Sequence, residues 1–147
     1  MPANTAPIFT LTPKFSAVRI QAANTSSSGS GTIGTDIYLA FSPGSNGSYL
    51  QKIRFSLAES TIATASSACV LRVFLSTQSS GSTTASNTWL IQEVVAATQT
   101  PSNTLSASPI DIPLNFAIPS NYYVLVSASV APTANTTWNA NVFGGDY

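Results

Sequence analysis

Five carboxylate side chains are the residues of this sequence best suited to do chemistry. They are Asp36, Glu59, Glu93, Asp111 and Asp146, and they are isolated from one another along the chain. Two carboxylates about 5 to 9.5 Å apart in a cleft can hydrolyse a glycosidic bond. Carboxylates also bind Ca²⁺, but no calcium-loop pattern of alternating Asp or Asn followed by Gly occurs. A carboxylate-dependent hydrolase stays an alternative that needs the fold to join two acids, and no metal or other cofactor is expected.

The sequence contains no histidine. Histidine is the usual general base near neutral pH and the commonest metal ligand. Nucleophilic systems in which histidine activates serine or cysteine are therefore excluded. Cys69 is the only cysteine and lies in an apolar run, which predicts a buried, unreactive thiol with no disulfide partner in this chain. These residue types predict that the protein is not an enzyme and has no catalytic residues.

One short motif matches a nucleotide-binding pattern in its letters. Residues 29–34 read Gly-Ser-Gly-Thr-Ile-Gly, as in the G-x-G-x-x-G fingerprint of dinucleotide-binding folds. That fingerprint needs a strand before it, a helix after it and an acidic residue about 20 positions further on. Here a serine tract comes first, a β-type run follows, and the residue twenty positions after Gly34 is Arg54. The motif is therefore interpreted as a flexible glycine loop.

Aromatic side chains form a second group of candidates. A stacking platform for sugar rings could be built from Trp89, Trp138, Tyr122, Tyr123 and Tyr147. Both tryptophans lie within strand-like patterns, so packing in the core or in an interface is the favoured interpretation. A receptor-binding or glycan-binding module of a fibre is kept as the alternative function.

Charge is scarce in this sequence. Charged residues make up 7% of the chain and the formal net charge is zero, whereas about 25% charged residues are usual. The basic residues are Lys14, Arg19, Lys52, Arg54 and Arg72. They are too few to follow a phosphate backbone, so nucleic acid is not an expected partner. No apolar run approaches the roughly 18 residues of a membrane span and no secretory signal pattern opens the chain, so no membrane partner and no export are expected.

The elements that must position these residues are predicted to be β-strands. Apolar residues do not repeat at helical spacing over a dozen positions, and β-branched and aromatic residues dominate the short apolar runs. We predict eight or nine strands among the runs 8–12, 15–22, 33–41, 48–57, 68–76, 88–96, 110–116, 122–130 and 137–143. Turns are predicted at Pro13 and Lys14 and in the tracts rich in Gly, Ser, Asn and Pro.

The residue patterns within these runs predict antiparallel sheets. Ile53, Phe55 and Leu57 alternate with Lys52 and Arg54, which makes one face core and the other solvated.

Other runs, at 70–75 and 122–126, are apolar on both faces. Such runs predict a cover over the second face, either a subunit contact or a loop. Uneven loops favour a jelly roll or Greek key over an up-and-down barrel. We predict an all-β antiparallel β-sandwich with little or no helix, formed by residues 13–147. Residues 1–12 precede it as an arm with a possible first strand.

Both ends of the chain carry distinctive short motifs. Residues 2–14 read Pro-Ala-Asn-Thr-Ala-Pro-Ile-Phe-Thr-Leu-Thr-Pro-Lys, residues 23–25 Ala-Asn-Thr, residues 29–32 Gly-Ser-Gly-Thr and residues 143–147 Phe-Gly-Gly-Asp-Tyr. Together with the strand rhythm, these motifs resemble small structural proteins of tailed bacteriophages. The segment 76–109 shows no such resemblance.

The resemblance implies a virion component and, for a chain of this size, a capsid decoration or cement protein. The implied partners are the major capsid protein and further copies of this chain in a homotrimer. The implied location is the capsid surface of the virion, after assembly in the host cytoplasm. Residues 1–7 are either a clamp over a neighbouring subunit or a frayed terminus. The interface candidates are Pro2, Pro7, Phe9, Phe74, Tyr123 and Tyr147.

Overall fold

Every regular element of the described chain is a β-strand. The computed structural model describes residues 10–60 and 64–147. Its ten strands are β1 (Thr12–Ile20), β2 (Gly31–Thr32), β3 (Tyr38–Phe41), β4 (Ser48–Glu59), β5 (Cys69–Ser76), β6 (Ser82–Thr83), β7 (Thr88–Ala96), β8 (Ile110–Ile118), β9 (Tyr123–Ala128) and β10 (Thr136–Asp146). No part of the described chain forms a helix with the length and hydropathy needed to span a membrane. The prediction of an all-β fold is confirmed.

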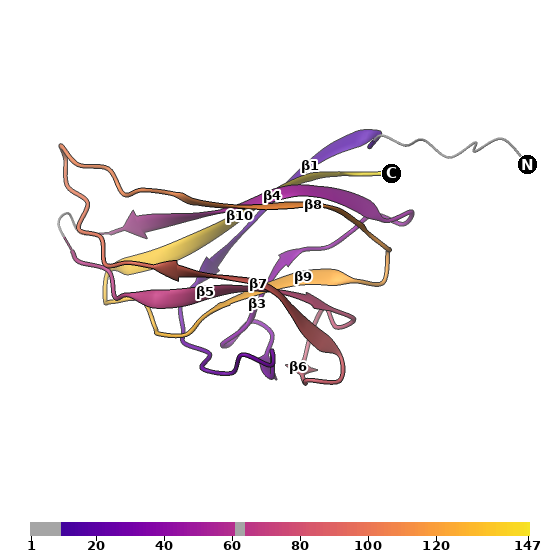
Figure 1. The fold of residues 1–147 in the computed structure, drawn as a ribbon, viewed down its shortest axis with the longest axis horizontal. Coiled ribbons are helices and arrows are strands. Elements are labelled where there is room, and N and C mark those ends of the chain that lie inside the picture. The colour runs from indigo at the N-terminus through magenta and orange to yellow at the C-terminus, as the bar shows by residue number, and fades with distance from the viewer. Residues whose placement is uncertain (1–9, 61–63) are drawn as a thin grey trace, which may run out of the picture.

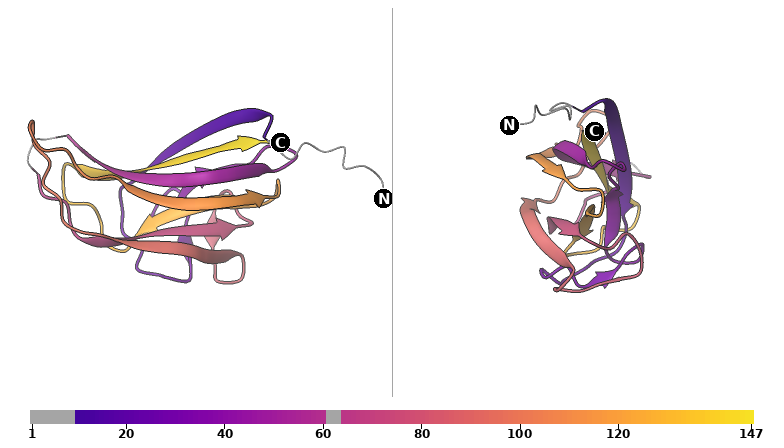
Figure 2. Two further views of the ribbon diagram at one scale, coloured as in Figure 1. Left: turned by 45° about the horizontal axis from the view of Figure 1, so that its top comes forward. Right: turned by 90° about the vertical axis from the view of Figure 1, so that its right-hand side faces the viewer.

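Two four-stranded antiparallel sheets lie face to face (Figure 1). The upper sheet in the figure has the order β1-β10-β4-β8, and the lower sheet has the order β3-β9-β5-β7. The short strands β2 and β6 form a separate pair. Figure 2 shows the same two layers from two further directions. The predicted β-sandwich is therefore confirmed, and the eight long strands correspond to eight of the nine predicted runs.

The order of the eight long strands is that of a jelly roll. The first pairs with the eighth (β1 with β10), the second with the seventh (β3 with β9), the third with the sixth (β4 with β8) and the fourth with the fifth (β5 with β7). These pairings describe one long antiparallel hairpin that has been rolled up. The β10–β4 and β5–β9 pairings then complete the two sheets.

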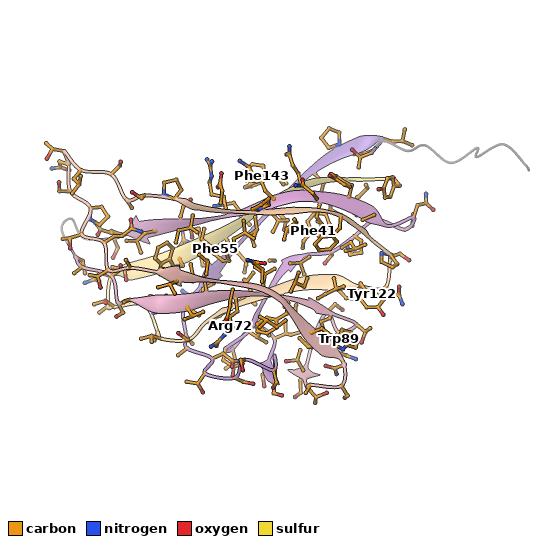
Figure 3. All side chains as sticks on the ribbon, viewed as in Figure 1. Phe41, Phe55, Arg72, Trp89, Tyr122 and Phe143 are labelled. Carbon is orange, nitrogen blue, oxygen red and sulfur yellow. The ribbon has the colours of Figure 1, made fainter. Side chains whose placement is uncertain are left out.

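The main core lies between the sheets and follows the predicted alternation. Ile53 and Phe55 are buried, whereas Lys52 and Arg54 of the same strand lie on the solvent side. Figure 3 shows Phe55 between the two layers, together with Phe41 of β3.

Cys69 lies in the same core, as predicted. Burial raises the pKa of its thiol, and an interaction with Trp138 opposes this rise in part. A thiol with a raised pKa is a weaker nucleophile near neutral pH, because less of it is thiolate.

A second, smaller core lies on the outer face of the lower sheet. It contains Ile37, Phe74 and Leu125, each 0% exposed, and Ile33 and Leu39 pack against it. The segment 21–37 supplies the cover, since it carries two of these residues beneath the strands β5 and β9 (Figure 1). Of the two covers predicted for strands that are apolar on both faces, the loop is the one observed.

Polar contacts fix this covering segment to the sheet. The Asn24 N–H donates to the carbonyl of Ala128 at 2.8 Å, and Arg72 of β5 donates from Nη1 to the carbonyl of Asn24 at 3.1 Å. Thr83 of β6 donates from Oγ1 to the carbonyl of Gly29 at 2.6 Å. These donors satisfy backbone carbonyls that would otherwise be buried without partners.

The glycine motif forms a loop and a tight turn, and no helix follows it. Gly34 has φ +89°, in the left-handed region that glycine adopts without strain. Asp36 Oδ1 accepts a hydrogen bond from the N–H of Thr32 at 2.7 Å, which closes the turn. The loop interpretation holds in part, because residues 29–30 and 33–36 lie outside any strand, whereas Gly31 and Thr32 form the short strand β2. The predicted strand at 33–41 is wrong in its first half for the same reason, because this turn occupies the residues before β3.

The start of β1 also differs from the prediction. Pro13 and Lys14 were predicted to form a turn, but both lie within β1, which begins at Thr12. Because β1 is an edge strand, one side of it has no ladder to which a proline nitrogen must donate. The predicted strand at 8–12 lies partly outside the described residues.

Replacement of Phe74 by alanine tests the second core. We expect Phe74→Ala to lower the free energy of unfolding by about 3 to 5 kcal/mol, because a large buried ring is lost and a cavity remains. Urea unfolding followed by circular dichroism measures the change. Val95→Ala, at a side chain that is 73% exposed, is the control, and we expect it to change stability by less than about 0.5 kcal/mol. A similar small loss for Phe74→Ala would contradict the assignment of this cluster as core.

Candidate functional site

The fold distributes the five carboxylates over five elements. Asp36 lies in the turn before β3, Glu59 in β4, Glu93 in β7, Asp111 in β8 and Asp146 in β10. Three of them are ion-paired: Asp146 with Lys14 at 3.0 Å, Glu93 with Arg72 at 3.3 Å, and Asp111 with both Lys52 and Arg54. A fourth, Asp36, accepts a backbone N–H. Four of the five acids thus have a cation or an N–H as partner. Across residues 10–60 and 64–147 no cluster of three or more Cys, Asp or Glu could hold a metal ion.

A charge network lies on the outer face of the upper sheet. Asp111 accepts hydrogen bonds from Arg54 Nε at 2.6 Å and Nη2 at 2.7 Å, and from Lys52 Nζ at 3.1 Å. The Arg54 guanidinium, with Lys52 beside it, holds the pKa of Asp111 well below its usual range, and the same pair raises the pKa of Arg54. All three groups are exposed, so the network adds little stability. Because two cations share one carboxylate, the network keeps a net charge of +1 on this face.

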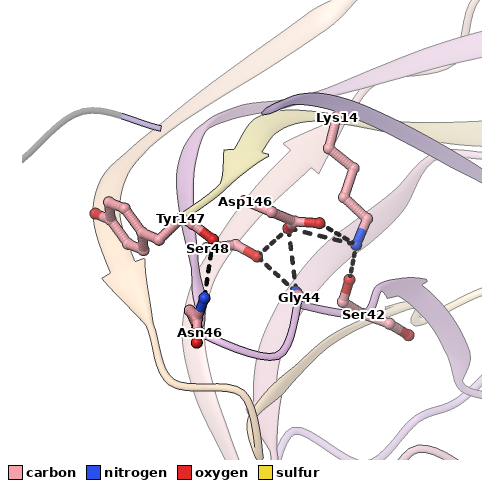
Figure 4. Close-up of polar contacts among 7 residues, drawn as sticks. All are labelled: Lys14, Ser42, Gly44, Asn46, Ser48, Asp146 and Tyr147. Atoms are coloured by element: carbon pink, nitrogen blue, oxygen red, sulfur yellow. Dashed lines mark hydrogen bonds and ion pairs between the residues drawn. The ribbon is translucent and has the colours of Figure 1, made fainter. Parts of the chain in front are cut away.

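A second polar cluster fastens the end of β10 (Figure 4). Asp146 accepts hydrogen bonds from Lys14 Nζ at 3.0 Å, from Ser48 Oγ and from the Gly44 N–H at 3.1 Å. Burial by itself raises the pKa of Asp146, but the donors Ser48, Lys14 and Gly44 outweigh it and hold the pKa below its ordinary value. We call this set, Lys14, Gly44, Ser48 and Asp146, the Asp146 cluster. The cluster joins β1 and β10 to the start of β4 and to the loop that precedes β4. Its role is therefore structural.

Three of the six predicted interface residues, Phe74, Tyr123 and Tyr147, lie within the described chain, and these three do not share one surface. Pro2, Pro7 and Phe9 lie outside the described residues. The prediction of Phe74 as an interface residue is wrong, because the covering segment buries its ring within the subunit. Tyr123 is half-buried at the start of β9 in the lower sheet, and Tyr147 is half-buried after β10 in the upper sheet.

The two tryptophans have different environments. Trp138 is buried in the main core, as favoured. Trp89 is 44% exposed at the start of β7, and its ring centroid lies 6.1 Å from that of Tyr122 with the planes 38° apart (Figure 3). Such a spacing is typical of interacting aromatic pairs.

Exposed apolar side chains continue along the edge strand β7. Leu90 is 40% exposed and Val95 is 73% exposed. Trp89 lies opposite Leu75, which packs against the main core, whereas Leu90 lies opposite Phe74 of the second core, so these two side chains point to opposite faces of β7. We call Trp89, Leu90 and Val95, which are exposed along this one strand, the β7 edge row. Leu90 and Val95 were not among the sequence candidates. The sequence feature that could have identified them is the presence of apolar residues on both faces of this strand. Such a strand is normally interpreted as buried in the core, and only the strand order shows that this one lies at an edge.

The outer face of the upper sheet carries a row of aromatic and cationic side chains across three strands. Phe15 of β1, 60% exposed, lies opposite Phe143 of β10, with ring centroids 5.3 Å apart. Lys52 of β4 lies opposite Phe143 and its Nζ is 5.4 Å from the centroid of that ring. Among residues 10–60 and 64–147, no segment covers this face as residues 21–37 cover the lower sheet (Figure 1).

Next to this row the same face contains a hollow of about 290 Å³. Its lining residues are Thr10, Tyr49, Gln51, Asn115 and Gly144. The sequence predictions included none of them. We call this feature the Gln51 hollow.

Comparison with known proteins identifies no relative. No protein-family model matches the chain, and no curated protein has a significantly similar sequence.

The Asp146 cluster generates a pH-dependent prediction. Because the folded pKa of Asp146 is lowered, its stabilisation is present above the unfolded pKa of about 3.9 and is lost as the pH falls through the lower folded pKa. We expect Asp146→Asn to lower the free energy of unfolding at pH 7 by about 1 to 2 kcal/mol. The difference from the natural chain should shrink below about pH 4.

Urea unfolding at a series of pH values measures this effect. Asp111→Asn is the matched control, because its ion pairs are exposed and we expect little change in stability at pH 7. A loss for Asp146→Asn that is the same at pH 3 as at pH 7 would count against the cluster as described.

Proposed function

We propose that this protein is a non-enzymatic structural subunit of a bacteriophage particle, where it decorates or cements the capsid by protein–protein contacts. The observation that carries the proposal is the β7 edge row, in which Trp89, Leu90 and Val95 expose apolar surface along one strand. The motifs at the two ends of the chain, which resemble small phage structural proteins, supply the biological setting.

The chemistry of the β7 edge row favours a protein partner. Edge strands that expose apolar side chains are sites of association. Tryptophan is also enriched among the residues that contribute most to binding at protein interfaces. A partner that covers Trp89 and its neighbours removes this apolar surface from water, which stabilises the complex by roughly 25 cal/mol per Å² before the costs of association.

The strand edges themselves favour contact through side chains over the addition of a further strand. The pairing of β7 with β5 shifts register between Val73 and Phe74, which marks a bulge in the middle of the edge. The other long edges carry Pro13 in β1 and Pro113 in β8. Bulges and prolines are the devices that prevent continuous sheet formation between molecules. Subunits are therefore joined, in this proposal, by packed side chains.

The proposed partners are the major capsid protein and further copies of this chain, on the outside of the capsid. A homotrimer is the proposed state, because closed cyclic symmetry lets identical subunits repeat one contact around an axis. Neither nucleic acid nor a membrane has a part in this function. The arm at residues 1–7 remains a proposed clamp on a neighbouring subunit.

A glycan-binding module of a fibre is the second candidate function. The observation that favours it is the exposed Trp89, whose ring lies beside the half-buried Tyr122, since an aromatic face can stack on a sugar ring. In this alternative Trp89 contacts a saccharide and not a protein.

Association with phage heads tests the first proposal. Particles of the encoding phage are separated into heads and tails, and mass spectrometry locates the chain. We expect it in the head fraction. We also expect Trp89→Ser combined with Val95→Ser to weaken binding of the purified protein to heads at least about tenfold, because a central apolar contact is lost.

Val130→Ser is the control for that experiment, because Val130 is 44% exposed outside β7. It should bind heads as the natural chain does, and circular dichroism should show both variants folded. Occurrence of the chain in tails only, or unchanged head binding by the double variant, contradicts the proposal. Loss of glycan binding by the Trp89 variant with head binding retained selects the second function.

A further inference from the structure

We propose that the Gln51 hollow is a binding site for a neutral saccharide. The site lies on the outer face of the upper sheet and is separate from Trp89 and Tyr122, which lie at one end of β7 and β9. It does not depend on a role in the capsid.

The hollow forms where strand β4 loses its register with both neighbours. Against β10, Lys52 pairs with Phe143 and Leu50 pairs with Gly144, so the ladder passes over Gln51. A residue passed over in this way is the extra residue of a bulge. Bulges of this kind re-aim a side chain and occur often beside binding sites.

The ladder between β4 and β8 is interrupted at the same place. Leu50 pairs with Phe116 and Lys52 pairs with Pro113, so Leu114 and Asn115 both lie across from Gln51. Two interruptions thus coincide at a single residue. The regular pleat of the sheet is broken there, and the surface is hollowed.

Asn115 adopts a conformation that its neighbours must maintain. Its φ is +52°, in the left-handed region, and within residues 10–60 and 64–147 only Asn135 shares this property among residues other than glycine. Glycine is the least strained residue at such a position. Asparagine adds a carboxamide there, and its Oδ1 lies 3.5 Å from the Tyr49 hydroxyl. The strain thus places a hydrogen-bonding group at the rim of the hollow.

Gly144 keeps one wall of the hollow free of side chains. A Cβ atom at this position would overlap the carbonyl oxygen of Tyr49. Glycine is therefore required where β10 passes the bulge, and it leaves bare backbone next to the Tyr49 and Gln51 side chains.

The lining defines the chemistry of the ligand. It offers the phenol ring of Tyr49, the carboxamides of Gln51 and Asn115, the hydroxyl of Thr10 and backbone groups, and it contains no carboxylate, ammonium or guanidinium group. Carboxamides both donate and accept hydrogen bonds, as sugar hydroxyls do, and an aromatic ring packs against the C–H face of a sugar. A phosphate or carboxylate ligand would find no cation in this lining, and an aliphatic ligand would leave the amides without partners.

The size and position of the hollow agree with this ligand. A volume of about 290 Å³ is at the lower end of the range for small-molecule sites. We therefore assign it one or two sugar units. The hollow lies on the upper sheet and the β7 edge row belongs to the lower sheet, so a partner bound at that row does not occupy the hollow.

An immobilised panel of neutral oligosaccharides of glucose, galactose, mannose and N-acetylglucosamine tests the proposal with the full chain. The strongest binder is then titrated into the protein by calorimetry. We expect at least one binder, and we expect Tyr49→Ala and Asn115→Gly each to weaken its affinity at least about tenfold. Asn115→Gly removes the carboxamide and keeps the backbone conformation accessible, so we expect the variant to remain folded.

Asn135→Gly is the matched control, because it makes the same exchange at the other asparagine with positive φ. It should bind the saccharide as the natural chain does. The proposal is overturned if no saccharide of the panel binds at about 10 mM protein or ligand, or if Tyr49→Ala and Asn115→Gly bind normally. It is also overturned if Trp89→Ser abolishes binding while Asn115→Gly does not. Absence of the chain from phage heads overturns only the capsid proposal and leaves this one standing.

Discussion

The packing of residues 21–37 against the lower sheet determines which surfaces of this molecule are free. Phe74 and Leu125 project from central strands on the side away from the main core, and Ile37 closes over them. Burying such side chains stabilises the fold by about 1.5 to 3 kcal/mol each. The same contact removes one sheet face from any partner. Among the described residues, the outer face of the upper sheet and the edge formed by β7 carry no such cover.

Internal neutralisation of charge gives these free surfaces their character. The four ion pairs of the described residues join Lys14, Lys52, Arg54 and Arg72, four of the five basic side chains, to three carboxylates. Long-range electrostatic attraction therefore contributes little to recognition by this protein. In the functions proposed above, shape, aromatic rings and carboxamides provide the specificity. The β7 edge row and the Gln51 hollow are surfaces of that kind.

The fold was predictable because its main signal is local. Alternation of Ile53 and Phe55 with Lys52 and Arg54 shows which side of β4 is core, whatever the neighbouring strands are. The identity of the cover over β5 was not predictable. An apolar strand face indicates that it is covered, but it does not indicate whether a loop or another subunit covers it. Trp89 and Trp138 also lie in similar patterns, and only the order of strands places one at an edge and the other in the core.

The Gln51 hollow could not be predicted from sequence patterns, for a further reason. It arises from the relative register of three strands that lie far apart in the chain. The alternation of apolar and polar residues along a strand predicts neither the bulges nor the positive φ of Asn115. Asparagine after a run of alternating residues is read as a turn former or a solvated strand residue. Local rules fail here because the decisive geometry is tertiary.

The position of β10 has a consequence for biosynthesis. This strand is the last of the ten along the chain, yet it lies between β1 and β4, so that Thr12 pairs with Asp146 across the upper sheet. The upper sheet cannot form until residues 136–146 have left the ribosome. Sandwiches with such distant pairings fold slowly, on timescales of roughly milliseconds to seconds. A nascent chain interrupted before β10 would lack the strand that pairs with both β1 and β4, so only chains translated through β10 can complete the upper sheet.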